Sequence, residues 1–202
     1  MTKDRWLSLM QAMKLDASLP CYESLLSAYS EAHRHYHTCS HISAMLRHFD
    51  QSITECKYPN EVELAIWFHD AVYKPFSSSN ELDSAKWAKE FLYSANYKED
   101  GIERVHQLIM ATLHNGEAFT DDAKLLVDID LSILGVPETT YDEFEKNIRK
   151  EYHLVPAIIY RQKRKQLLSS FLERQFIYNT VRYQEQYETQ ARENLERAMH
   201  KL

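Results

Sequence analysis

Glycine occurs only three times in this chain of 202 residues, and proline occurs only five times. Both residues end helices and shape the tight turns that join strands, so their scarcity favours helices over sheets and hairpins. The spacing of the apolar residues predicts about ten helices and no strand. The length allows one sizeable core, and the sequence has no evident linker or internal repeat. We therefore expect an all-α fold, with one compact multi-helix domain over residues 1–202.

Three of the expected helices are defined by their boundaries. One runs from about His37 to Cys56 and carries an apolar face. Pro59 opens the next, because proline is tolerated in the first turn of a helix. Gly101 precedes a third helix, which Asn115-Gly116 is expected to end in a left-handed cap.

Charge and cysteine content narrow the class of protein. The formal net charge of −6 disfavours general nucleic-acid binding, which needs a basic surface facing the phosphates. The three cysteines have no C-x-x-C spacing, which indicates free thiols in a reducing compartment, and the cytoplasm is expected. The sequence shows neither an N-terminal apolar signal segment nor a run of roughly 18 apolar residues, so no membrane association is expected.

Four short groups of potential metal ligands follow one another along the chain, each in or beside an apolar stretch of helical character. Residues four apart on a helix share a face, with Cβ atoms about 5–6 Å apart, so the two histidines of the first group are predicted to face one cavity. The run 64–68 before the second group is apolar on every side, as expected of a buried central helix. Their order predicts one buried metal site. The groups are His37-x-x-x-His41, His69-Asp70, His114 and Asp128-x-Asp130.

Several of these residues also have a structural interpretation. His41 could be a hydrogen-bonded core histidine, whereas Asp70 would be costly to bury without a cation or another partner. Asp128 and Asp130 are two residues apart and face different ways on a helix, so only one of them is expected to bind the metal. His114 could meet the negative end of a helix, or it could contact a substrate phosphate or a second ion.

Glu81 has two interpretations as well. With Ser78 it matches a capping box, the pattern in which the first and fourth residues satisfy the amides at a helix start. Because it follows His69-Asp70 by one loop, its carboxylate could instead orient an attacking water. We keep both interpretations.

The succession of His41, His69-Asp70 and Asp130 on a helical chain resembles the HD superfamily of metal-dependent phosphohydrolases, which is named for its adjacent His-Asp pair. Tyr36-His37-x-x-x-His41 is also similar to the Tyr-His-Asn-x-x-His signature of cyclic-nucleotide phosphodiesterases, although Thr38 stands where that signature has Asn. Roughly residues 30–195 resemble a small bacterial family of predicted HD phosphohydrolases. The matching stretches are Arg34-His35-Tyr36-His37-x-x-x-His41-Ile42, Phe68-His69-Asp70-Ala71-Val72-Tyr73, Asn80-Glu81-x-x-Ser84-Ala85 and Asp128-x-Asp130-Leu131-x-Ile133-Leu134-Gly135.

The resemblance implies an HD-type domain with a metal core at about 30–135 and long C-terminal helices at about 137–202. It implies four metal ligands, a proton donor at His37, and Asp128 as a residue that orients a ligand or caps a helix. The implied ligands are His41, His69, Asp70 and Asp130. Their nitrogen and oxygen donors suit one divalent ion, which could be Mn, Fe, Co, Ni, Zn or Mg, with a second ion as an alternative.

The expected function is that of a phosphohydrolase, in which a metal-activated water attacks a small phosphoester such as a nucleotide. The phosphate needs cations beyond the metal, and residues beside the ligand groups are the candidates. These phosphate-binding candidates are Arg34, Lys74, His114 and Arg161. Two alternatives remain: a di-iron oxygenase of HD type, and a non-catalytic nucleotide-binding module with a structural metal. A homo-oligomer is compatible with each.

Overall fold

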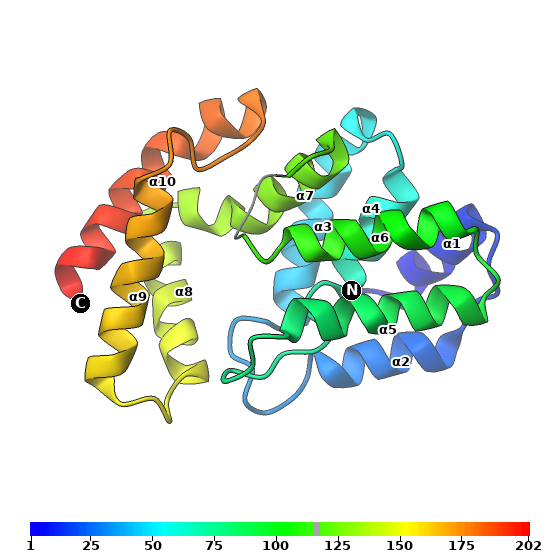
Figure 1. Ribbon diagram of the computed structural model, residues 1–202, viewed down its shortest axis with the longest axis horizontal. Coiled ribbons are helices and arrows are strands. Elements are labelled where there is room, and N and C mark those ends of the chain that lie inside the picture. The colour runs from blue at the N-terminus through cyan, green and yellow to red at the C-terminus, as the bar shows by residue number, and fades with distance from the viewer. Residues whose placement is uncertain (115–117) are drawn as a thin grey trace. The chain divides into compact units, whose positions relative to one another are not determined.

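The computed structural model describes residues 1–114 and 118–202, and this part of the chain is helical with no strand (Figure 1). It contains ten α-helices and two short 3-10 segments, Ile53–Glu55 and Ser132–Gly135. The all-α prediction is therefore confirmed. The helices are α1 (Lys3–Met13), α2 (Leu19–Ala28), α3 (Cys39–Ser52), α4 (Pro59–Phe68), α5 (Asn80–Ser94), α6 (Glu99–Ala111), α7 (Asp121–Leu131), α8 (Glu138–Glu151), α9 (Ala157–Leu172) and α10 (Val181–Lys201).

The internal contacts group the chain into two compact units, Met1–Leu126 and Val127–Leu202. Helix α7 begins in the first unit and ends in the second. Each unit has its own buried apolar residues, and the single domain over 1–202 stays a prediction. Every described helix is too short or too polar to span a lipid bilayer.

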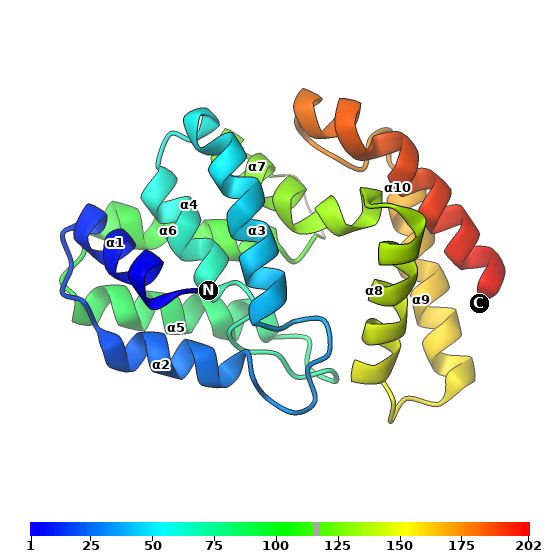
Figure 2. The ribbon, with the colours of Figure 1, turned by 180° about the vertical axis from the view of Figure 1, so that it is seen from behind.

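Helix α4 lies at the centre of the first unit. It contacts α1, α3, α5 and α6, and Figure 2 shows α3 running beside it. Residues 64–68 are all completely buried, which confirms the central helix predicted from the apolar run. The ring of Trp67 meets Trp6 edge-on, with 5.3 Å between ring centroids. The residues that directly follow α4 therefore start from the core of the unit.

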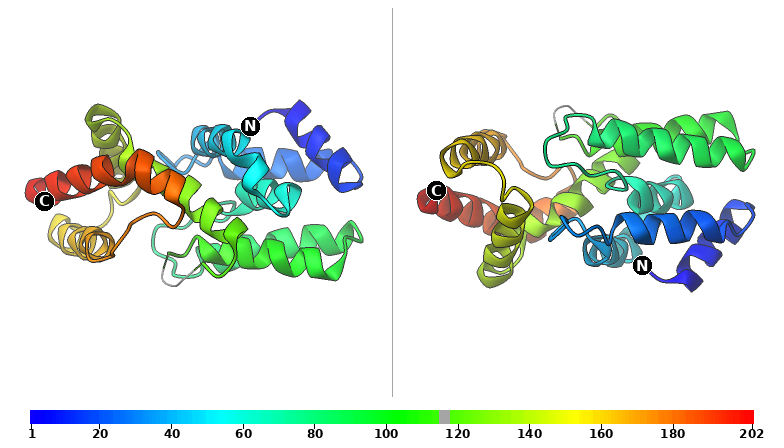
Figure 3. Two further views of the ribbon diagram at one scale, coloured as in Figure 1. Left: turned by 90° about the horizontal axis from the view of Figure 1, so that it is seen from above. Right: turned by 90° about the horizontal axis from the view of Figure 1, so that it is seen from below.

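Helices α5 and α6 lie side by side, and α6 also approaches α4 closely (Figure 3). The contact is built around the buried carboxylate of Glu61, which accepts hydrogen bonds from two nitrogens of Arg104 at 2.6 and 2.8 Å and from the Tyr97 hydroxyl at 3.0 Å. A Cβ atom at Gly101 would lie 2.3 Å from the Tyr97 ring and 2.8 Å from Glu61. Glycine permits this approach inside the first turn of α6. The expectation that Gly101 precedes the helix is wrong, because α6 begins at Glu99.

The expected cap at Asn115-Gly116 lies outside the described residues. Helix α6 itself ends at Ala111.

The second unit consists of α8, α9 and α10 together with the end of α7 and the 3-10 segment that follows it. Helix α10 packs on α9 and on this 3-10 segment. The buried side-chain amide of Asn194 donates to the carbonyls of Leu134 and Val136, at 2.9 and 2.8 Å. Asp142 of α8 pairs with Arg197 and Lys201 of α10. Polar contacts therefore join α10 both to the segment that follows α7 and to α8.

Candidate metal site

His41 lies in the first turn of α3 and is 6% exposed. The helix begins only at Cys39, because Thr38 is its N-cap and accepts a hydrogen bond from the Ser40 amide. His37 therefore precedes the helix, and the prediction that His37 and His41 share a helix face is wrong. The two rings nevertheless stay close, with 6.1 Å between their centroids.

His69 and Asp70 directly follow the buried helix α4. His69 is the C-cap residue, its amide still donates to Ala65, and its side chain is 1% exposed. Its Nδ1 atom lies 3.0 Å from the carbonyl oxygen of Ile66. A carbonyl can only accept, so Nδ1 carries the hydrogen, and the Nε2 atom of the neutral ring presents a lone pair. Fixing one ring nitrogen in this way prepares the other as a metal ligand.

Three potential ligand atoms converge in the first unit. The Nε2 atoms of His41 and His69 are 3.3 Å apart. The Oδ2 atom of Asp70 lies 3.0 Å from His69 Nε2 and 3.7 Å from His41 Nε2. An imidazole lone pair that faces a carboxylate oxygen at this distance is repelled unless a proton or a metal ion lies between them. The arrangement therefore fits a cation.

The electrostatic balance at Asp70 favours its charged form. Burial raises the pKa of this carboxyl. Positive charge at His69, His37 and His41 and a hydrogen bond from His69 lower it by more, and they act when a proton on His69 Nε2 takes the place of the metal ion. The net pKa lies well below the usual value for aspartate. Asp70 therefore stays ionised at neutral pH and presents the form of the carboxyl group that binds metals.

His41, His69 and Asp70 all belong to the first unit and to the ligand set predicted from the sequence. Asp130, the fourth predicted ligand, is carried by α7, one residue before that helix ends, and belongs to the second unit. Its role as a ligand stays a prediction. A set of imidazole nitrogens and carboxylate oxygens suits a divalent transition metal or magnesium.

Arg34 connects the two segments that carry the ligands. Its buried guanidinium donates to the carbonyls of His37, Asp70 and Ala71, at 3.2, 2.7 and 3.0 Å, and to the carboxylate of Glu31 at 2.9 Å. Four of its five N–H donors are used in this way. The geometry thus gives Arg34 a positioning role, because it holds the chain before α3 against the chain after α4. Its binding of a substrate phosphate stays a prediction.

Replacing Arg34 by lysine is expected to weaken metal binding about 10- to 100-fold, the usual effect of losing a group that orients the ligands. Lysine keeps the charge but cannot reach three carbonyls with one planar fork. Arg47→Gln, an exposed change on α3, is the control and should bind metal as the unchanged chain does. Competition with a chelator measures the affinity. An unchanged affinity in Arg34→Lys would contradict the positioning role.

Two aromatic rings near the histidines were not anticipated from the sequence. The Tyr73 ring stacks on His37, with 4.1 Å between centroids, and the Tyr36 ring lies 4.8 Å from that of His41. Their positions in the chain gave a signal, since Tyr36 directly precedes His37 and Tyr73 follows Asp70 by three residues. These rings form an apolar wall beside the ligands.

Two other predicted site residues follow α4. Lys74 lies in the loop between α4 and α5, and Glu81 lies at the start of α5. Glu81 is half-buried in the first turn of α5. The N-cap of α5 is Ser79, and the described structure shows no side-chain capping bond there, so the Ser78-Glu81 capping box is wrong. Lys74 is exposed, and its backbone exchanges two hydrogen bonds with the Asn80 side chain. The catalytic role of Glu81 and the phosphate-binding role of Lys74 stay predictions.

The last two candidates lie further along the chain. His114 follows the end of α6 and adopts a left-handed backbone conformation with φ of 56°. Arg161 belongs to the second unit, where it lies on α9 and lines a cavity. The prediction that they bind a substrate phosphate at the metal site stays untested.

Comparison of the chain with family models, with curated proteins and with solved structures finds no match. The likeness to the HD superfamily is one of motifs and their order. The geometry of His41, His69 and Asp70 is therefore the observation on which a function can be built.

Proposed function

We propose that the protein is a metal-dependent phosphohydrolase of the HD type that acts on a small phosphoester, with nucleotides as the first candidates. The convergence of His41 Nε2, His69 Nε2 and Asp70 Oδ2 carries this proposal. These residues and Asp130 would hold the ion, and the two carboxylates would balance a divalent charge. The resemblance of the His-Asp groups to HD phosphohydrolases supports the reaction class.

These residues would hold a divalent ion, which would activate a water molecule for attack on the phosphorus atom by lowering its pKa. The protein's own residues would orient the ligands, transfer a proton and bind the substrate. The carbonyl of Ile66 holds the proton of His69 on Nδ1, so that Nε2 stays available. His37, stacked on Tyr73, would protonate the leaving oxygen, since imidazole transfers protons near neutral pH. Lys74, exposed on the neighbouring loop, would bind the substrate phosphate.

The proposal also includes the cellular compartment in which the protein works. Cys21, Cys39 and Cys56 are free thiols in the structure. Free thiols are the usual state in a reducing compartment, so we infer that the enzyme works in the cytoplasm.

The direct test combines metal analysis with an assay. We expect the purified chain to contain one divalent ion, to lose hydrolysis of bis(p-nitrophenyl) phosphate or of a nucleotide after chelation, and to regain it when Mn is added. Two irons per chain with oxygen consumption would contradict the proposal and point to an oxygenase. Tight nucleotide binding without turnover would contradict it in favour of a binding module.

A further inference from the structure

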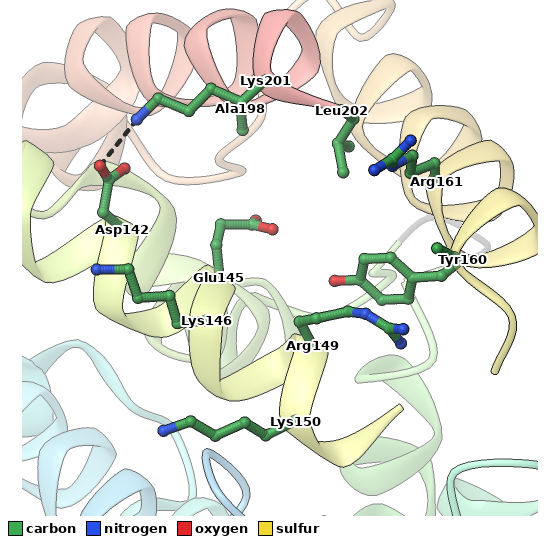
Figure 4. Close-up of a pocket in the computed structure, with 11 residues that line it drawn as sticks. Asp142, Glu145, Lys146, Arg149, Lys150, Tyr160, Arg161, Ala198, Lys201 and Leu202 are labelled. Atoms are coloured by element: carbon green, nitrogen blue, oxygen red, sulfur yellow. Dashed lines mark hydrogen bonds and ion pairs between the residues drawn. The ribbon is translucent and has the colours of Figure 1, made fainter. Parts of the chain in front are cut away.

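The second unit contains a cavity of about 570 Å³, lined by α8, the start of α9 and the end of α10 (Figure 4). This volume is in the range of small-molecule sites, about 300–1,000 Å³. Its lining combines several cations with one buried hydroxyl. No residue of the proposed metal site lies in it.

The acidic residues that line the cavity are already neutralised. Asp142 pairs with Arg197 and Lys201, and Glu145 accepts two hydrogen bonds from the buried Arg164. The cavity lining has more basic residues than acidic ones. The basic residues of the lining are Lys146, Arg149, Lys150, Arg161 and Lys201.

Some of these cations have structural roles. Arg149 donates to the carbonyls of Tyr152 and Val155 beyond the end of α8, as basic residues at helix C-termini commonly do. Arg161 and Lys146, in contrast, have no acidic partner among the described residues. The cavity therefore keeps uncompensated positive charge.

Arg161 has an unusual position for a free cation. It is the fifth residue of α9, near the positive end of the helix dipole, where a cation is unfavourable. As described, α9 has no side-chain cap and no acidic residue in its first turn, and its first residue, Ala157, lines the cavity. The uncapped helix start and Arg161 together favour an anion, since the amides of a helix start bind phosphate readily. Figure 4 shows the guanidinium of Arg161 directed into the open space.

Tyr160 provides the second, independent observation. Its side chain is 8% exposed, and its hydroxyl is buried without a hydrogen-bond partner among the described residues. A buried hydroxyl without a partner is unfavourable and calls for a ligand or a water. Figure 4 shows the hydroxyl directed into the cavity. Burial raises the pKa of Tyr160, so the group stays protonated and can donate to an anion.

We propose that this cavity binds a small phosphorylated organic molecule, whose phosphate is held by Arg161, the start of α9 and the Tyr160 hydroxyl. Guanidinium and amide donors match phosphate oxygens. The apolar side chains of Ala157, Ala198 and Leu202 would cover the organic part of the ligand. This site is separate from the proposed metal site.

Isothermal titration calorimetry on the full chain in excess chelator tests the proposal. Phenyl phosphate and AMP are expected to bind with a saturable curve, and adenosine is expected not to bind. Arg161→Gln should weaken binding about tenfold, the effect of losing one charge-assisted hydrogen bond. Lys165→Gln removes the same charge from an exposed position of α9 outside the cavity and should leave the affinity unchanged.

Tyr160→Phe separates a binding role from a structural one. It should weaken binding severalfold without lowering the midpoint of urea unfolding, because the hydroxyl has no partner in the protein. The proposal is overturned if neither ester binds, or if Lys165→Gln weakens binding as much as Arg161→Gln. It is also overturned if Asp70→Ala abolishes binding, since the esters would then occupy the metal site. Hydrolysis by the metal-loaded chain is tested separately, so either proposal can fail alone.

Discussion

Asp70→Ala is expected to leave the protein folded but unable to retain its metal ion, and hydrolysis of a phosphodiester should fall to the rate of the chelated protein. The carboxylate lies 3.0 Å from His69 Nε2 and supplies negative charge at the converging nitrogens. Its loss should weaken metal binding by more than the roughly 10- to 100-fold expected for a residue that only orients a ligand. Metal content after dialysis and the turnover rate measure the effect.

The fold should survive this change because Arg34 holds Asp70 through its backbone. The guanidinium donates to the Asp70 carbonyl oxygen at 2.7 Å, and alanine keeps that oxygen. Asp100→Ala is the matched control, since it removes an exposed carboxylate of the same unit and should retain both metal and activity. Full metal content in Asp70→Ala would exclude Asp70 as a ligand.

The sequence predicts the helices and the order of the ligand groups well, because both depend on local patterns. Helix α4 ends one residue before His69, as the apolar run 64–68 followed by a His-Asp pair indicates. Spacing alone is misleading at His37, where the i, i+4 pattern predicts a helix face shared with His41. Thr38 competes with that pattern, because its hydroxyl caps the helix at the next residue.

Other features depend on contacts between distant parts of the chain, which no single-sequence pattern encodes. Arg34 reaches the carbonyls of Asp70 and Ala71, more than thirty residues away. A carbonyl acceptor cannot be recognised in the sequence, so the sequence alone predicts that Arg34 binds phosphate. The unpartnered Tyr160 hydroxyl is hidden for the same reason, since an absence of partners is visible only in three dimensions.

Asp128 is a residue whose importance the sequence indicates but whose partners it does not. The sequence predicts that Asp128 orients a ligand or caps a helix, whereas in the structure its carboxylate binds the two residues just before α10. Its buried carboxylate accepts hydrogen bonds from the backbone amides of Asn179 and Thr180, both at 2.7 Å. These residues directly precede α10, a helix that begins more than fifty residues later in the chain.

Asp128→Ala is expected to lower the free energy of unfolding by at least about 3 kcal/mol, because hydrogen bonds to a charged group and the buried donors left behind each contribute one to several kcal/mol. Four donors lose their acceptor: the two amides, the Asn179 side chain at 2.9 Å and the Thr180 hydroxyl at 2.7 Å. Urea unfolding measures the change. Faster amide hydrogen exchange at Asn179 and Thr180 should accompany it.

Asp142→Ala is the matched control for this prediction. Its carboxylate also meets two partners within the second unit, Arg197 and Lys201, but it is 32% exposed. Partly exposed ion pairs contribute less than about 1 kcal/mol, because water solvates the separated charges nearly as well. If both variants unfold at the same urea concentration, the buried carboxylate does not hold the start of α10. A large loss in Asp128→Ala alone identifies the hydrogen bonds between Asp128 and the two residues before α10 as a main source of stability in the second unit.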